Sequence, residues 1–129
     1  MNKAQALYEF WNSFGVSAID EQSAYDEDTL KDLNIDFPYI TYETATSSFD
    51  NEVALSANLW DKSTSWARIT ELADTISAEI GYGGKVIMID NGYVWLKLGN
   101  PFAQRFPVDN ADNVRRITIN ITADFLTAD

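Results

Sequence analysis

The strongest constraint on the fold of this chain is the regular alternation of side chains near its carboxyl end. Between Arg116 and Leu126 every second residue is apolar and the residues between them are polar. The apolar set is Ile117, Ile119, Ile121, Ala123 and Phe125, and the polar set is Thr118, Asn120, Thr122 and Asp124. Because successive side chains of a strand point to opposite faces, this pattern predicts a strand with one buried face. Such a strand needs neighbouring strands and a second layer over its apolar side.

Two segments have the spacing of helices that could form this second layer. Residues Asn2–Phe14 place apolar side chains three and four apart, and a glycine directly follows them. Residues Ser65–Ile80 carry a longer apolar stripe. Ser63 or Thr64 is the candidate N-cap of this second helix, and Gly81 is its candidate C-cap.

Four further segments, rich in β-branched or aromatic residues, are predicted as strands. They are Phe37–Thr46, Glu52–Asp61, Lys85–Asp90 and Tyr93–Leu98. Asn91-Gly92 stands between the last two and is typical of a type I′ hairpin turn. A polar hairpin loop, Ser47–Asn51, carries Phe49 at its tip, and the proline-containing segment Gly99–Asn113 is predicted to be irregular.

The order of these elements is α-β-β-α-β-β-β, with strands joined mainly as hairpins. This order predicts an α+β fold: a mainly antiparallel or mixed sheet of about five strands, with one main helix packed on a face and an additional N-terminal helix. A chain of 129 residues fits one domain. We expect residues 1–36 to form the N-terminal helix and an acidic connection, and residues 37–129 to form the α+β core.

Composition excludes several classes of function. The chain has no Cys and no His, which excludes disulfides, thiolate or imidazole catalysis and the common zinc sites. Its formal net charge of -11 is the wrong sign for a protein that grips phosphate backbones or anionic lipid. The longest aliphatic run, Val86–Ile89, is too short to span a membrane. We therefore expect a soluble, cytoplasmic product without specific nucleic-acid or membrane binding.

The acidic residues do not form a recognisable catalytic or metal-binding motif. The stretch from Asp20 to Asp32 is interpreted as a solvated connection, because Asp26-Glu27-Asp28 lacks the spacing, the glycine and the distal glutamate of an EF-hand. Residues Gly81–Val86 follow a predicted helix rather than a strand, which favours a helix cap over a phosphate loop.

Carboxylates at predicted strand ends are the remaining candidates for catalysis. Glu43, Asp61 and Asp90 could form a glycosidase-like pair. Twenty acidic residues in a short chain bring such pairs together by chance. We expect no enzymatic activity, no catalytic residue, no metal ligand and no cofactor.

Aromatic residues on the polar face of the predicted sheet are the candidates for interaction. Strand periodicity places Trp60, Tyr93 and Trp95 together on this face. Two interpretations are open: the N-terminal helix covers these rings, or they form a subunit interface.

Further candidates lie in the predicted loops and at the only basic doublet. The segment that contains Phe102, Arg105 and Phe106 is either a core plug or a docking element. Phe49, at the tip of the predicted hairpin loop, is a further interface candidate. Arg115-Arg116 places its two side chains on opposite faces of a strand, so an ion pair within the sheet or between subunits is favoured over a nucleic-acid patch.

Several of these segments together resemble a family of phage proteins. They are Phe37–Tyr42, Trp60–Trp66, Pro101–Gln104 and Arg116–Leu126. The chain resembles tail terminator, or tail-to-head joining (tail completion), proteins of long-tailed phages and of prophages of Gram-positive bacteria. The similarity runs from Phe37 to the carboxyl end and lies in pattern and element order rather than in a catalytic signature.

The resemblance implies a structural virion protein. It implies a homo-oligomeric ring, expected to be a hexamer, that caps the tail tube and meets the head connector, with DNA passing through the lumen. The protein would lie in the tail or neck of the virion, and in the host cytoplasm during assembly. The alternatives are another neck or tail component, such as a head-completion or tube protein, a small cytoplasmic binding module, and a carboxylate-dependent hydrolase.

Overall fold

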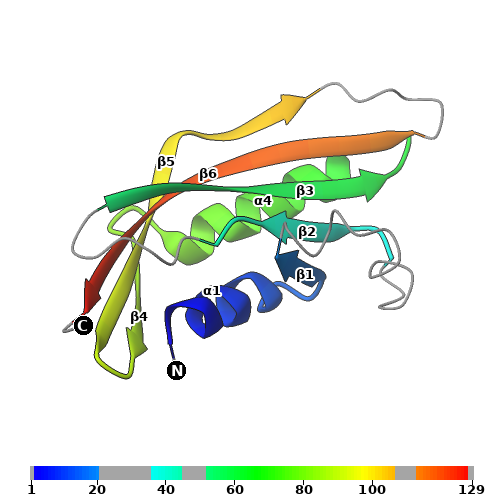
Figure 1. Cartoon of the computed structure of the whole chain (residues 1–129). Helices are drawn as coiled ribbons and strands as arrows, with labels where there is room; N and C mark the ends of the chain where they lie inside the picture. Colours follow the sequence, from blue (N-terminus) through cyan, green and yellow to red (C-terminus); the bar gives the residue numbers. More distant parts are fainter. Residues whose placement is uncertain (1, 21–35, 45–51, 107–112, 128–129) are drawn as a thin grey trace.

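The fold is known from a computed structural model, which describes residues 2–20, 36–44, 52–106 and 113–127. Two helices and six strands are present in this part of the chain (Figure 1). Their bounds are α1 (Lys3–Asn12), β1 (Ser17–Asp20), β2 (Tyr39–Tyr42), β3 (Glu52–Lys62), α4 (Ala67–Ile80), β4 (Lys85–Ile89), β5 (Gly92–Phe106) and β6 (Val114–Thr127).

The strands form one mixed sheet with the order β1-β2-β3-β6-β5-β4. β1 and β2 are parallel, and the other neighbours are antiparallel. β5 and β6 bend along their length, so that the sheet curls (Figure 1). The α+β class and the mixed sheet are confirmed, but the expected number of about five strands is wrong.

The strand missing from the sequence prediction is β1. It has only four residues, too few for a period of two to stand out, and its last residue, Asp20, is the first residue of the acidic stretch that the sequence analysis interprets as a connection. Ser17 pairs with Tyr39 and Asp20 pairs with Tyr42, so β1 depends on β2 for its formation. Most of that acidic stretch, residues 21–32, lies outside the described residues.

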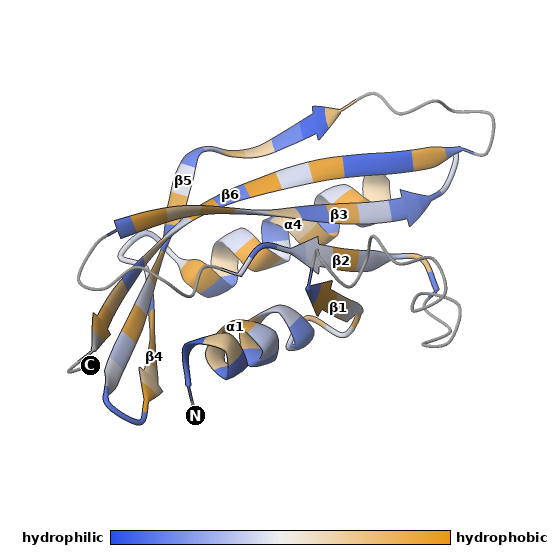
Figure 2. Ribbon diagram, viewed as in Figure 1, coloured by the Kyte–Doolittle hydropathy of each residue, from blue (hydrophilic) through white to orange (hydrophobic). Residues whose placement is uncertain are grey.

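Both helices pack on one face of the sheet, and the hydropathy of the strands alternates between this face and the other (Figures 1 and 2). Trp11 of α1 stacks on Tyr42 with ring centroids 6.3 Å apart, and Lys3 lies over the ring of Phe125. The core between the layers contains the fully buried Leu7, Ile40, Leu59, Ile69, Ile76, Val94, Leu96, Ile119, Ile121 and Phe125. We call this side the helix face and the other side the open face, because no described helix covers the latter.

The second half of β5 differs most from the sequence prediction. Residues 99–106 were expected to be irregular, but they continue the strand to Phe106. Leu98 pairs with Ile121 and Ala103 pairs with Ile119, so the intervening residues of β5 oppose Asn120 alone. This bulge admits a proline within the strand, and the side-chain amide of Asn120 donates a hydrogen bond to the Pro101 carbonyl at 3.0 Å.

The two predicted helices are confirmed, with shifted ends. α4 ends at Gly81 (φ +75°) as expected, but it starts after Trp66, which makes no side-chain capping bond. Neither Ser63 nor Thr64 is therefore its N-cap. The hydroxyl of Ser65 instead accepts from the amide of Ala67. α1 begins with a reciprocal capping box between Asn2 and Gln5.

The hairpin between β4 and β5 is confirmed, but its turn is not type I′. Ile89 pairs with Gly92, so Asp90 and Asn91 form the loop. Among the described non-glycine residues only Asn113 has a positive φ, whereas a type I′ turn needs positive φ at both loop positions.

The turn between α4 and β4 gives a direct test of the packing. A Cβ on Gly84 would lie 2.7 Å from the carbonyl oxygen of Leu96 and in contact with the indole of Trp95, at a φ of +86°. We expect Gly84→Ala to lower the free energy of unfolding by about 1–3 kcal/mol in urea denaturation. Gly83→Ala is the control, because nothing lies within 4 Å of its added Cβ. Equal stability of the two variants would contradict this packing.

Candidate interaction surface

The open face of the sheet carries the residues that sequence periodicity assigned to it. The pairing of β3 with β6 sets Trp60 beside Arg116 and Glu52 beside Asp124, at the two ends of this face. Polar pairs fill the middle, and the hydroxyl of Thr118 donates to Asn58 at 2.7 Å. α1 packs on the opposite face, so the interpretation that it covers these rings is wrong.

One end of the open face carries a row of stacked side chains across four strands, which we call the aromatic–arginine ladder: Tyr39, Trp60, Arg116 and Phe106. The rings of Tyr39 and Trp60 are stacked with centroids 6.3 Å apart. The guanidinium carbon of Arg116 lies 5.6 Å from the Trp60 centroid and 4.9 Å from the Phe106 centroid. Cation–π contacts of this kind hold the guanidinium in a defined place without using its N–H groups.

The ladder is fixed on its tryptophan side. The indole N–H of Trp60 donates to the hydroxyl of Thr41 at 3.0 Å, and Thr41 is itself buried. Burial raises the pKa of the Tyr39 hydroxyl above its ordinary value, which already keeps this ring neutral at physiological pH. The ladder is therefore a preformed surface feature with one positive charge.

Arg116 has unused hydrogen-bonding capacity. Its Nε is buried without a hydrogen-bond partner, and none of the ion pairs between described residues includes Arg116. The ion pair expected for the Arg115-Arg116 doublet within the sheet is therefore not formed among the described residues. Lys62, two positions from Trp60 on β3, is exposed on the same face and forms no ion pair there either.

Trp95 and Tyr93 lie at the opposite end of the open face. Trp95 pairs with Asp124, eight residues along β6 from Arg116, which is up to about 26 Å away along the strand. The expectation that Trp60, Tyr93 and Trp95 form one patch is therefore wrong. The Trp95 indole donates to the Gly83 carbonyl at 3.0 Å, and Lys97 lies over its ring at 4.0 Å.

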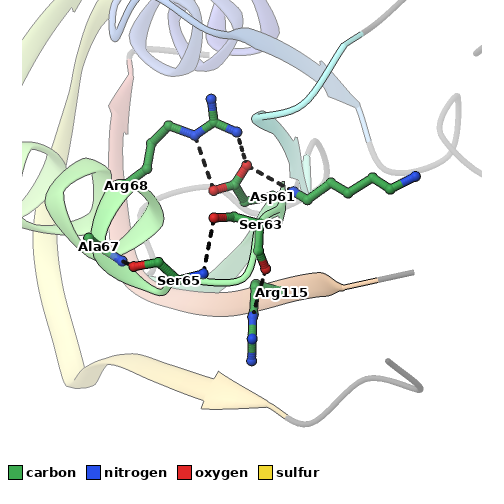
Figure 3. A network of polar contacts seen from close by, with 7 residues as sticks. Asp61, Ser63, Ser65, Ala67, Arg68 and Arg115 are labelled. Carbon is green, nitrogen blue, oxygen red and sulfur yellow. Dashed lines mark hydrogen bonds and ion pairs between the residues drawn. The ribbon is translucent and has the colours of Figure 1, made fainter. Parts of the chain in front are cut away.

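A polar network lies on the helix face, at the same end of the sheet as the ladder (Figure 3). Asp61 is fully buried and accepts two hydrogen bonds from the guanidinium of Arg68, which raises the pKa of Arg68. Arg115, the pairing partner of Asp61, donates to the carbonyls of Ser63 at 3.1 Å and Thr64 at 3.3 Å. This network ties the end of β3 to the start of α4 and gives Asp61 a structural role.

The remaining predicted residues are divided between the two faces. Phe102 packs against the hydrophobic core, which agrees with a core plug. Arg105 pairs with Ile117 on the helix face, where its guanidinium carbon lies 4.9 Å from the Trp66 centroid. Phe106 joins the ladder on the open face. Phe49 lies outside the described residues.

Sequence reasoning missed the two members of the ladder that surround Trp60. Tyr39 was placed on a strand, but its register against Trp60 depends on the β2–β3 pairing. For Arg116 the sequence predicts an ion pair within the sheet or between subunits, and not a place between two aromatic rings. The alternation of β6 could have placed Arg116 correctly. Arg116 is two residues before Thr118 and four before Asn120, so its side chain lies on the same polar face as theirs and as Trp60.

No family model, curated protein or solved structure matches this chain. In the described part of the chain, no helix combines the length and apolar character needed to cross a membrane. The same residues contain no group of three or more acidic side chains placed to hold a metal ion.

The ion pair between the buried Asp61 and the exposed Arg68 should contribute more to stability than a pair in which both partners are exposed. Asp61→Asn removes the charge that Arg68 binds, and we expect a loss of about 1–3 kcal/mol in the free energy of unfolding. Glu79→Gln breaks the exposed pair with Lys85, whose atoms are 2.6 Å apart, and should cost less than about 0.5 kcal/mol. Urea denaturation of both variants measures the difference. Equal losses would show that burial does not decide the strength of these pairs.

Proposed function

We propose that this chain is a structural virion protein of a long-tailed phage or prophage. In this proposal it is a tail terminator, or tail completion, protein that forms a homo-oligomeric ring at the head-proximal end of the tail tube and joins the tail to the head. The resemblance of the segment from Phe37 to the carboxyl end to that family supplies the class, and the open face of the sheet supplies a surface for assembly.

The observation that carries the proposal is the aromatic–arginine ladder on the open face. Trp, Tyr and Arg are enriched at the energetic centres of protein interfaces. Here they are stacked in advance, so little side-chain entropy is lost when a partner docks. Substrate sites are concave and carry convergent polar groups, whereas the ladder is a row of stacked side chains on one face of a sheet.

The charge of the chain is compatible with a ring around DNA. A net charge of -11 repels phosphate backbones, so nucleic acid passing through the lumen would not be held. Such a ring would use protein contacts alone, with the tail-tube protein on one side and the head connector on the other.

Another neck or tail component, such as a head-completion or tube protein, is the nearest alternative, because the same small α+β architecture could serve it. A small cytoplasmic binding module is the alternative outside the virion. Polymerisation of the isolated protein into tubes would favour a tube subunit.

Substitution of Trp60 tests whether the ladder is an assembly surface. We expect Trp60→Ala to reduce oligomer formation at least tenfold, because it removes the central ring of the ladder, while the far-UV circular dichroism spectrum is unchanged. Tyr82→Ala is the control, since this aromatic ring is fully exposed in the turn after α4. A loss of the spectrum itself would instead identify Trp60 as a residue needed for folding.

Deletion of the gene tests the biological role. Without a terminator, tail tubes are expected to polymerise to uncontrolled lengths and heads to remain without tails, as seen by electron microscopy of the lysate. Complementation with the wild-type gene should restore joined virions. Normal virions from the deletion would exclude the proposed function.

A further inference from the structure

Positive charge is concentrated at one end of this acidic protein. Five of the eight basic residues in the described ranges lie where β3 ends, β6 begins, β5 ends and α4 begins: Lys62, Arg68, Arg105, Arg115 and Arg116. Arg68 is paired with Asp61, and Arg105 and Arg115 stack on Trp66 on the helix face. Arg116 and Lys62 are the cations of this end that belong to the open face.

Arg116 has the features of a preformed anion-binding group. Trp60 and Phe106 hold its guanidinium, and the described chain supplies no acceptor for it. A guanidinium presents its N–H donors in a planar fork that matches a carboxylate or a phosphate. Because stacking fixes the fork in advance, binding of such a group costs little entropy.

The net charge distinguishes between these two anions. A polyphosphate would approach a chain with a charge of -11 and, among the described residues at this end of the open face, find only Arg116 and Lys62, because Lys97 lies at the other end and is paired with Glu52. A single carboxylate pair on a protein surface needs no more than these two cations. The acidic composition also means that each copy of the chain offers exposed carboxylates to the next copy.

The most suitable carboxylates lie on the outer side of α4. Glu71 and Asp74 are three residues apart, so they share one helix surface, and both are exposed. Neither makes an ion pair with a described residue. The apolar side of α4, with Ile69, Ala73 and Ile76, is buried against the sheet, so these carboxylates point away from the core.

We infer that Arg116, with Lys62 beside it, binds Glu71 and Asp74 of a second copy of this chain. The open face of one subunit then contacts the helix layer of the next. Such a head-to-tail contact uses two different surfaces, and it closes into a ring when the rotation between subunits permits. This inference rests on the proposed function for the choice of partner, and it names the residues of the contact between subunits.

The test measures self-association of the purified protein by analytical ultracentrifugation over a range of salt concentrations. Two copies with a net charge of -11 repel each other at low salt, so we expect association at moderate salt, where this repulsion is screened, and weaker association at high salt, where the contact between charges is screened as well. Arg116→Gln should weaken it about tenfold, and Glu71→Gln with Asp74→Asn should weaken it by a similar factor. Arg105→Gln is the matched control, because it removes one positive charge from the same end of the sheet on the helix face.

Combination of the substitutions tests whether the two sites meet. If they contact each other, the variant that carries all three changes should lose less than the product of the two separate losses, because Lys62 retains part of the contact in Arg116→Gln. Losses that multiply in full would overturn the pairing, as would normal association of Arg116→Gln or a wild-type protein that stays monomeric at every salt concentration. The α4 substitutions lie at exposed positions, so they test the contact even if Arg116→Gln affects folding.

A second measurement separates a carboxylate from a phosphate. The Nε–Hε signal of Arg116 in nuclear magnetic resonance spectra should shift as protein concentration rises and stay unchanged when a short DNA duplex is added. The reverse result would show a phosphate site and overturn the inference. The deletion phenotype is independent of these measurements: abnormal tails with unaffected association of Arg116→Gln would retain the proposed function and reject this contact.

Discussion

The antiparallel pairing of β3 with β6 is the interaction on which the rest of the structure depends. Eleven residue pairs, from Glu52 with Asp124 to Lys62 with Val114, fix the register of the two central strands. Because side chains of paired residues point to the same face, this register puts the apolar positions of both strands together. A shift of β6 by one residue would turn Ile117 and the other apolar residues of that strand to the open face and leave Leu59 without its partner in the core.

The same register creates the open face, because every buried pair alternates with a pair on the other side. Trp60 stands beside Arg116 for the same reason that Leu59 stands beside Ile117. The neighbouring strands then complete the row, with Tyr39 on β2 and Phe106 on β5. Stacking across four strands places a cation between two rings, and the helices on the opposite face leave it accessible. The proposed assembly surface is therefore a consequence of core packing.

Much of the fold could be predicted from local pattern. The alternation of Arg116–Leu126, the stripe of α4 and the β4–β5 hairpin each satisfy a period that the sequence shows directly. β1 could not be predicted, because its four residues pair only with β2, and the second half of β5 could not, because its bulge opposite Asn120 hides the period of two. The candidate site was predicted in part. The alternation of side chains along the strand gave the face on which Trp60 lies, but not its distance from Trp95.

The sequence alone determined which side chains share a face, because the period of a strand or helix is set by backbone geometry within a few residues. It also determined the acidic charge and the absence of Cys and His. Tertiary structure decided which strands are neighbours, that Arg116 lies between the rings of Trp60 and Phe106, and that α1 and α4 pack on the same face of the sheet. These features depend on contacts between residues far apart in the chain, such as Tyr39 with Trp60 and Phe106 with Arg116, and no local period records them.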